Sequence, residues 1–364
     1  KRDVTYTTRG NYMPGLFGIK HSNKDLTQRD SWGKNQFSST FPAALVAYMA
    51  SKSLDSVYLT LGDSQQVLHK TISAQNLFKL KADSDNLFYA FESIFSPYEQ
   101  FVKGKLPRID LVTQDRNTGI CFKGLEIKLT ALPDNSTCDL PDSQFGTEIV
   151  IRRDTIVYLA CSVAALYKNN LSSLETLLGN PYKVITDWTN AENVLPFIKK
   201  IAETIDCITT ANSGRQEPLV LQPIWKTEGK SPKLSQHCLD VFVWSNFALI
   251  ELFMREVRSQ PNVDRISRPM RTMIWLYKML VDFSQTGQFN HQQISDDLSY
   301  NTKNDKAFAS SGLVTYPFMK CSELTKPRVQ KNEIKNIVLD GGQNLLSPER
   351  RFDAIIFNSP DLFY

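Results

Sequence analysis

A predicted hairpin between residues 107 and 132 restricts the fold more than any other part of the sequence. RIDLV (108–112) has the composition of a short strand, DRNTG (115–119) that of a turn, and ICFKGLEIKLTAL (120–132) that of a second strand. A turn of this length between two apolar runs is typical of an antiparallel hairpin. We therefore expect the chain to build part of its fold around a β-sheet.

The second strand of this hairpin carries charged residues at alternate positions. Side chains alternate between the two faces of a strand. Glu126 and Lys128 would therefore share one face, and the other would carry three aliphatic residues: Leu125, Ile127 and Leu129. The first strand would bring Asp110 beside the charged pair. A surface ion pair between Glu126 and Lys128, worth under about 1 kcal/mol, would explain the same pattern without any chemistry.

Asp110, Glu126 and Lys128 are the groups that phosphodiester hydrolysis needs. Mg²⁺ prefers oxygen ligands, usually one or two carboxylates together with waters and phosphate oxygens. We expect Asp110 and Glu126 to hold Mg²⁺ with the backbone carbonyl of Ile127. The ion would offset charge on the scissile phosphate and lower the pKa of a bound water. Lys128 would orient that water or stabilise the developing charge. The segment therefore predicts a catalytic centre.

Helix and strand signals along the chain indicate an α/β or mixed α+β fold. Further strands are expected at 57–61, 218–225, 238–244, 334–339 and 352–357. Helices are expected at 41–54, 87–104 (interrupted near Pro97), 155–168, 191–205, 246–257 and 269–285. No firm domain boundary is visible. We expect one large catalytic and DNA-binding domain over 1–364, with a catalytic core at approximately 40–170 and mainly recognition and dimerisation elements elsewhere.

The composition argues against several other classes of protein. Hydrophobic residues make up 41% of the chain and charged residues 22%, as in folded globular proteins rather than disordered ones. No run of about 18 apolar residues predicts a membrane span, and we see no secretory signal in the first residues. The six cysteines include no CxxC pair, which favours reduced thiols in a cytoplasm over a disulfide framework or zinc site.

Polar residues in other segments are candidates for contact with DNA. The net charge of +4 is small, but a DNA-binding protein can concentrate its positive charge on one surface. Lysine, arginine and glutamine side chains suit phosphates and base edges. The candidates are Lys34, Asn35, Gln36, Arg152, Arg153, Gln222, Trp225, Lys226, Arg350 and Arg351. Burial of Trp225 in a core strand and ion pairing of Arg350 and Arg351 at the surface are the alternatives.

Four blocks of the sequence resemble the HindVP-type restriction endonucleases, and they are spread across nearly the whole chain. The blocks are PGLFGIKHSNKDLTQRDSWGKNQFSSTFPAAL (14–45), LPRIDLV with LEIKLTALPDNST (106–137), LQPIWKTEGKSP (221–232) and LSPERRFDAIIFNSPDLF (346–363). The resemblance implies a PD-(D/E)xK core, in which a central mixed sheet is flanked by helices and supplemented by DNA-recognition elements. It also assigns the three motif positions to Asp110, Glu126 and Lys128, although Pro107 and Asp110 are not adjacent as the motif name suggests.

The resemblance further implies a bacterial type II enzyme that cuts duplex DNA with Mg²⁺ at GRCGYC-type sites. The products would carry 5′-phosphate and 3′-hydroxyl ends. A two-fold symmetric site suits a homodimer, and such enzymes are paired with a cognate DNA methyltransferase. In related cores a carboxylate from the preceding helix can join the outer shell of the metal, so Glu99 and Glu92 are additional candidates.

Two alternative functions remain compatible with the residues themselves. A repair or structure-specific nuclease of the same fold would share the catalytic residues without a sharp sequence preference. A non-catalytic DNA-binding protein would bind without cleavage and would be indifferent to the change Glu126→Ala.

Overall fold

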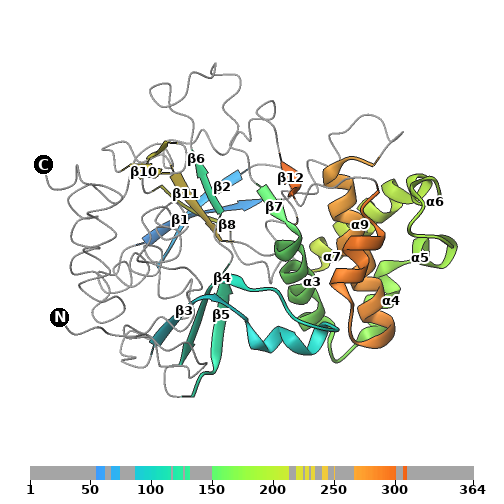
Figure 1. Ribbon diagram of the computed structural model, residues 1–364, viewed down its shortest axis with the longest axis horizontal. Helices are drawn as coiled ribbons and strands as arrows, with labels where there is room; N and C mark the ends of the chain where they lie inside the picture. The colour runs from blue at the N-terminus through green and yellow to red at the C-terminus, as the bar shows by residue number, and fades with distance from the viewer. Residues whose placement is uncertain are drawn as a thin grey trace, which may run out of the picture.

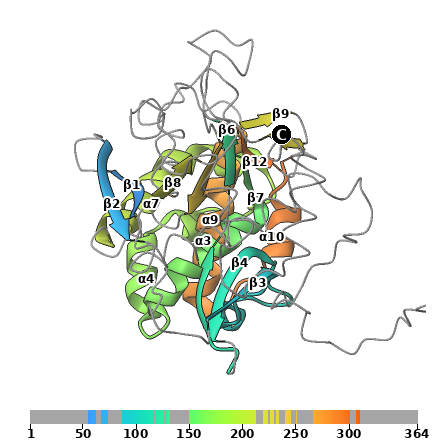
Figure 2. The ribbon, with the colours of Figure 1, turned by 90° about the vertical axis from the view of Figure 1, so that its left-hand side faces the viewer.

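The computed structural model combines antiparallel sheets with a group of packed helices (Figure 1). It describes residues 55–61, 67–73, 87–115, 118–125, 128–131, 150–212, 219–223, 226–228, 231–233, 240–244, 250, 266–300 and 306–309. In Figure 1 the helices gather on the right and most strands lie on the left, and Figure 2 shows the same arrangement turned by 90°. This confirms the expectation of a mixed helix and strand fold.

The larger sheet has five strands, and every pairing in it is antiparallel. In spatial order they are β2 (Val67–Ser73), β1 (Asp55–Leu61), β8 (Leu219–Pro223), β11 (Asp240–Trp244) and β6 (Lys128–Ala131). The strands expected at 57–61, 218–225 and 238–244 are confirmed as β1, β8 and β11. Runs such as DVFVW, rich in β-branched and aromatic residues, suit a pleated surface of this kind. All strand-to-strand ladders among the described residues are antiparallel, whereas we expected a mixed sheet.

The smaller sheet contains the predicted hairpin. Its strands are β3 (Leu87–Ser93), β4 (Ile109–Asp115) and β5 (Cys121–Leu125), in that order. β4 and β5 pair antiparallel, as expected. In the turn between them, the Thr118 N–H and hydroxyl both donate to Asp115 Oδ1, at 2.7 and 2.9 Å, and Gly119 has a positive φ of 70°.

The segment 120–132, predicted as one strand, contains two strands in the structure. Its described residues belong to two sheets, because β5 pairs with β4 whereas β6 pairs with β11. Only residues 126 and 127 separate the two strands along the chain. The segment therefore connects the three-stranded sheet to the five-stranded sheet.

The helix predicted at 87–104 is wrong. Residues Leu87–Ser93 form β3, and a short 3₁₀ helix, η2, follows at Ser96–Phe101. Pro97 lies in the first turn of η2, where its missing N–H costs nothing. The apolar residues of this segment suit a helix by spacing, but pairing of β3 with β4 along its length decides the structure. Long-range pairing of this kind overrides local preference.

The helices that pack together lie mainly between residues 153 and 297. They are α3 (Arg153–Tyr167), α4 (Leu171–Leu178), α5 (Pro181–Val184), α6 (Ala191–Val194), the 3₁₀ helix η4 (Leu195–Phe197), α7 (Ile198–Ala211), α9 (Arg268–Thr286) and α10 (His291–Asp297). The helices expected at 155–168 and 269–285 are confirmed as α3 and α9. The one expected at 191–205 is divided among α6, η4 and α7.

Helix α9 lies at the centre of the helical group and contacts α3, α4 and α7. Its buried face includes Met273, Ile274 and Leu280, each with no exposed surface. Ser267 caps its first turn by accepting a hydrogen bond from the N–H of Met270, as serine does at many helix starts. Gly287 ends it in the left-handed conformation that suits glycine.

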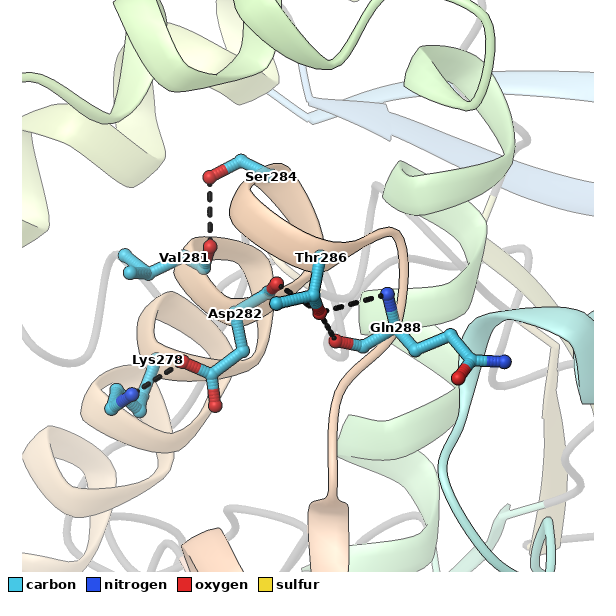
Figure 3. A network of polar contacts seen from close by, with 6 residues as sticks. All are labelled: Lys278, Val281, Asp282, Ser284, Thr286 and Gln288. Atoms are coloured by element: carbon cyan, nitrogen blue, oxygen red, sulfur yellow. Dashed lines mark hydrogen bonds and ion pairs between the residues drawn. The ribbon is translucent and has the colours of Figure 1, made fainter.

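The C-terminal turn of α9 contains a small network of polar contacts (Figure 3). Lys278 pairs with Asp282 one turn further along the helix. The Thr286 hydroxyl lies 2.9 Å from the carbonyl oxygen of Asp282 and 2.6 Å from that of Gln288. The Gln288 N–H donates back to the same hydroxyl at 3.3 Å. These contacts fix the direction in which the chain leaves α9.

Two short strand pairs complete the described structure. β7 (Val150–Arg152) pairs with β12 (Lys306–Ala309), and β9 (Lys226–Glu228) pairs with β10 (Ser231–Lys233). Within the described part of the chain, none of the helices is both long enough and apolar enough to cross a membrane. The helix expected at 41–54 and the strands expected at 334–339 and 352–357 lie outside the described residues. So does the helix at 246–257, except Ile250, which is helical and buried.

Candidate active site

Asp110 is the second residue of β4, the central strand of the three-stranded sheet. On the β3 side, the pairs Phe91↔Leu111 and Ser93↔Ile109 flank it. This register sets Glu92 at the position opposite Asp110, and facing positions of neighbouring strands are close enough for side chains to interact. Glu92 is therefore the acidic residue of β3 that the fold brings level with Asp110.

Of the other two predicted catalytic residues, the structure describes Lys128 but not Glu126. Glu126 and Ile127 lie outside the described residues. Lys128 is the first residue of β6, and its backbone pairs with Val243 of β11. Asp110 thus lies in one sheet and Lys128 in the other, and Leu125, the last residue of β5, pairs with Leu111 next to Asp110.

Glu99, the remaining predicted metal ligand, lies in η2 rather than on a long helix. Its side chain is exposed, and its backbone carbonyl accepts a hydrogen bond from the Val102 N–H at 3.3 Å. It follows β3 by several residues, whereas Glu92 lies within the strand itself.

A tyrosine of α3 fixes the strand ends next to Asp110. The hydroxyl of Tyr158 donates to the carbonyl oxygen of Pro107 at 2.9 Å and accepts from the Phe95 N–H at 3.2 Å. Pro107 precedes β4 and Phe95 follows β3. One side chain therefore ties together the two backbone segments that lead into and out of the Asp110 end of the sheet.

The third strand is held at the same end by close packing. A Cβ added at Gly124 of β5 would lie 3.1 Å from Cγ and 3.2 Å from Cβ of Phe95. A larger residue at this position would force Phe95 to shift by a few tenths of an ångström, so glycine suits this close approach. The sequence gives little sign of these roles, because Tyr158 and Phe95 resemble ordinary core aromatics and their partners are distant along the chain.

The proposed DNA-contact residues are described only in part. Arg152 is exposed at the end of β7, and Arg153, which begins α3, lies with Nε 3.9 Å from Asp154 Oδ1. Gln222 of β8 pairs with Phe242 of β11, and Lys226 begins β9. The others lie outside the described residues: Lys34, Asn35, Gln36, Trp225, Arg350 and Arg351.

Clear pKa shifts occur in the helical group. Burial raises the pKa of the Cys161 thiol and of the Tyr277 and Tyr300 hydroxyls. A hydrogen bond from the Thr189 hydroxyl lowers the pKa of the exposed carboxyl of Asp187. Among the residues that the structure describes, no group of three or more His, Cys, Asp or Glu side chains is placed to hold a metal ion.

Comparison with known proteins identifies the class. The sequence model of the HindVP restriction endonuclease family matches residues 32–363. The chain is 45% identical over 363 residues to the probable type II restriction enzyme HindVP of Haemophilus influenzae, covering 100% of this chain and 98% of the relative. It is 43% identical over 351 residues to the type II restriction enzyme HgiDI of Herpetosiphon aurantiacus, covering 96% and 97%. No solved structure matches.

Similarity at this level over whole chains defines the protein as an enzyme of the type II deoxyribonuclease class. Within that class, the chain belongs to the HindVP restriction endonuclease family. The resemblance found in the four sequence blocks is therefore confirmed.

Proposed function

We propose that this chain is a site-specific type II restriction endonuclease that hydrolyses duplex DNA with Mg²⁺. Its sites would be of the GRCGYC type, and its products would carry 5′-phosphate and 3′-hydroxyl ends, as the resemblance to HindVP-type enzymes implies. The near full-length similarity to two type II restriction enzymes supports this proposal.

The register of the β4–β5 ladder is the observation that carries the proposed catalytic centre. Its last described pair is Leu111↔Leu125, and in the sequence Asp110 precedes Leu111 while Glu126 follows Leu125. We infer that they are neighbours, with Lys128 two residues further on. This arrangement would form the PD-(D/E)xK centre of a restriction-endonuclease-like core.

The donor set fits a divalent cation. Glu92 occupies the position opposite Asp110, and like charges at facing positions of a sheet repel each other. A cation bound by carboxylate oxygens offsets that repulsion, and Mg²⁺ prefers such ligands. Asp110 and Glu126 would hold the ion with the backbone carbonyl of Ile127. Glu92 is better placed than Glu99 to supply a further carboxylate.

Asp110, Glu126 and Lys128 would have different roles in the reaction. When bound, Mg²⁺ lowers the pKa of a coordinated water and offsets charge on the scissile phosphate. Lys128 would orient the attacking water and stabilise the negative charge that develops on the phosphate oxygens. Asp110 and Glu126 would fix the position of the ion relative to that lysine.

The proposed partners are duplex DNA, a second copy of the chain and a cognate DNA methyltransferase. A homodimer would match the two-fold symmetry of the site and place one centre on each strand. Residues 1–364 would form one catalytic and DNA-binding domain that acts in the bacterial cytoplasm. The proposed DNA contacts are Lys34, Asn35, Gln36, Arg152, Arg153, Gln222, Trp225, Lys226, Arg350 and Arg351.

The test is digestion of a plasmid of known sequence by the purified full chain, with Mg²⁺ or with EDTA. We expect discrete Mg²⁺-dependent fragments that map to GRCGYC sites. Lys128→Ala should lower the cleavage rate at least about a hundredfold, because the loss of one transition-state contact has effects of this size. Lys199→Ala removes an equal charge from an exposed position of α7 and should leave the rate unchanged.

Other outcomes would replace this proposal with one of its alternatives. A smear or nicking without a fixed pattern would keep the catalytic centre but indicate a less specific nuclease. Binding without cleavage under any divalent metal would favour a non-catalytic DNA-binding protein.

A further inference from the structure

A short basic loop leads directly into the strand that carries Asp110. Residues 103–108, KGKLPR, connect the end of η2 to β4, and we call them the 103–108 loop. Lys103, Lys105 and Arg108 are exposed, whereas Leu106 between them is buried. The loop thus anchors itself through an apolar side chain and presents three cations to solvent.

The cations of the 103–108 loop are available to a ligand. None of them forms an ion pair with another described residue. Two basic residues of the helical group, by contrast, are paired with carboxylates: Lys200 with Glu203, and Lys278 with Asp282. Arg271 is buried, and its guanidinium donates to the carbonyl of Ser299. A cluster of unpaired cations attracts an anionic partner, and the partner of a nuclease is a polyanion.

The backbone of the 103–108 loop is held by three hydrogen bonds to two separate segments, residues 289–291 and helix α3. The Lys103 N–H donates to the carbonyl of Phe289 at 2.8 Å. His291 Nε2 donates to the carbonyl of Lys105 at 2.9 Å, and the Tyr158 hydroxyl donates to that of Pro107 at 2.9 Å. A loop fixed before binding loses little conformational freedom when a ligand arrives.

Residues just after the end of α9 also help to hold the 103–108 loop in place. The backbone of Gln288 contacts the Thr286 hydroxyl (Figure 3), and its side-chain Nε2 donates to the carbonyl of Gln100 at 3.1 Å. Phe289 then pairs with the chain on either side of Val102. The position of the loop is therefore set by the helical group rather than by the loop alone.

We propose that the 103–108 loop binds the sugar–phosphate backbone of DNA next to the cleaved bond. This inference rests on the proposed function, because it takes Asp110 as part of the catalytic centre. Arg108 is two residues and Lys105 five residues from Asp110, so chain length limits their Cα atoms to about 7 Å and about 17 Å from it. Phosphates of one strand follow each other every ~3.4 Å along the DNA axis. The loop therefore contacts phosphates close to the scissile one, and it contributes position and affinity rather than sequence preference.

The salt dependence of DNA binding tests this assignment. A triple variant, Lys103→Ala, Lys105→Ala and Arg108→Ala, is compared with the wild type on a duplex without any GRCGYC site, so that no cleavage intervenes. Each phosphate contact contributes about 0.9 to the slope of log K against log salt concentration. We expect the slope of the triple variant to be smaller in magnitude by about 2.7, and its affinity at low salt to fall at least about tenfold.

A matched triple variant controls for net charge. Lys168→Ala, Lys183→Ala and Lys199→Ala remove the same charge from exposed positions of the helical group and should leave the slope unchanged. A charge-keeping variant, Lys103→Arg, Lys105→Arg and Arg108→Lys, should bind as the wild type does. This charge-keeping variant separates the effect of lost charge from the effect of lost folding. Thermal unfolding of each variant also monitors its folding.

Two outcomes would overturn the assignment: an unaltered slope in the loop variant, or an equal loss in both alanine triples. Cleavage of GRCGYC DNA by the wild type is measured in parallel. If the wild type cleaves but the loop variant keeps its slope, the loop assignment fails alone. If the wild type does not cleave, the proposed function fails.

Discussion

The helical group and the Asp110 end of the three-stranded sheet are held together in different ways. The helical group, α3, α4, α7 and α9, is packed from many apolar side chains with almost no exposed surface, such as Ile201 and Leu280. The Asp110 end of the sheet belongs to the same core through buried residues such as Leu106 and Ile109, and it has in addition a few polar contacts with distant segments. Tyr158 lies 51 residues from Pro107 and 63 from Phe95, and His291 lies 186 from Lys105.

This difference separates stability from activity in the molecule. The stability of the helical group is distributed over many apolar contacts. We therefore expect the loss of one contact to lower the free energy of unfolding without moving Asp110. At the sheet end, a few hydrogen bonds, two of them made by Tyr158, fix the backbone beside a proposed catalytic residue. Substitutions there should change the cleavage rate more than they change the free energy of unfolding.

The largest effect on stability is expected from Leu280→Ala in α9. Leu280 has no exposed surface, and replacement of a buried leucine by alanine costs about 2–5 kcal/mol. Urea denaturation should show this loss, while the cleavage rate per folded molecule stays within about twofold of the wild type at low temperature. A tenfold loss of cleavage in fully folded protein would contradict the separation of the two regions.

A substitution at Gly124 should affect both properties. The added methyl group would lie 3.1 Å from Phe95 Cγ, and overpacking of this kind costs about 1–3 kcal/mol. Because Gly124 lies just before Leu125 and Glu126, we expect Gly124→Ala also to slow single-turnover cleavage about tenfold or more, since small displacements at a site can cost as much as a hundredfold.

Gly119→Ala provides the control at the opposite end of the same hairpin. Its Cβ would meet no atom within 4 Å, but Gly119 has a positive φ of 70°. The strain should cost about 1–2 kcal/mol without an effect on the cleavage rate of folded protein. Equal cleavage rates for the two alanine variants would argue that the position of β5 does not affect catalysis.

The smallest change in stability is expected for a pair of tyrosine substitutions. Tyr158→Phe and Tyr277→Phe each remove one hydroxyl that donates to a backbone carbonyl, at Pro107 (2.9 Å) and at Leu178 (2.8 Å). Tyr158→Phe also removes the acceptor of the hydrogen bond from the Phe95 N–H. Each should cost about 0.5–1.5 kcal/mol. If Tyr158 is a positioning residue, only Tyr158→Phe should lower kcat and raise the Mg²⁺ concentration needed for half-maximal rate. Identical kinetics for both variants would assign Tyr158 a structural role alone.

The elements that could be predicted from the sequence are those whose signals are local. The β4–β5 hairpin has a turn between apolar runs, and α3 and α9 have long apolar stretches, so all three were predicted correctly. The segment 87–104 was predicted wrongly because its apolar spacing fits a helix, whereas pairing with β4 makes Leu87–Ser93 a strand. Pairing between distant segments leaves no local mark in one sequence.

The same distinction between local signals and distant contacts applies to the candidate site. Asp110, Glu126 and Lys128 were chosen because their spacing on a hairpin suits Mg²⁺, and their catalytic roles remain proposals. The position of Glu92 opposite Asp110 depends on the register of β3 against β4. The support from Tyr158 and His291 depends on tertiary contacts. Neither could be derived from residue spacing.

The division of β5 and β6 between two sheets has a consequence for the proposed catalytic residues, because two of them lie in different sheets. Asp110 belongs to the three-stranded sheet, whereas Lys128 belongs to the five-stranded sheet, which also contains Gln222 of β8. A rigid displacement of one sheet against the other changes the distance between Asp110 and Lys128. If Asp110 and Lys128 act together as proposed, their alignment depends on the relative position of the two sheets.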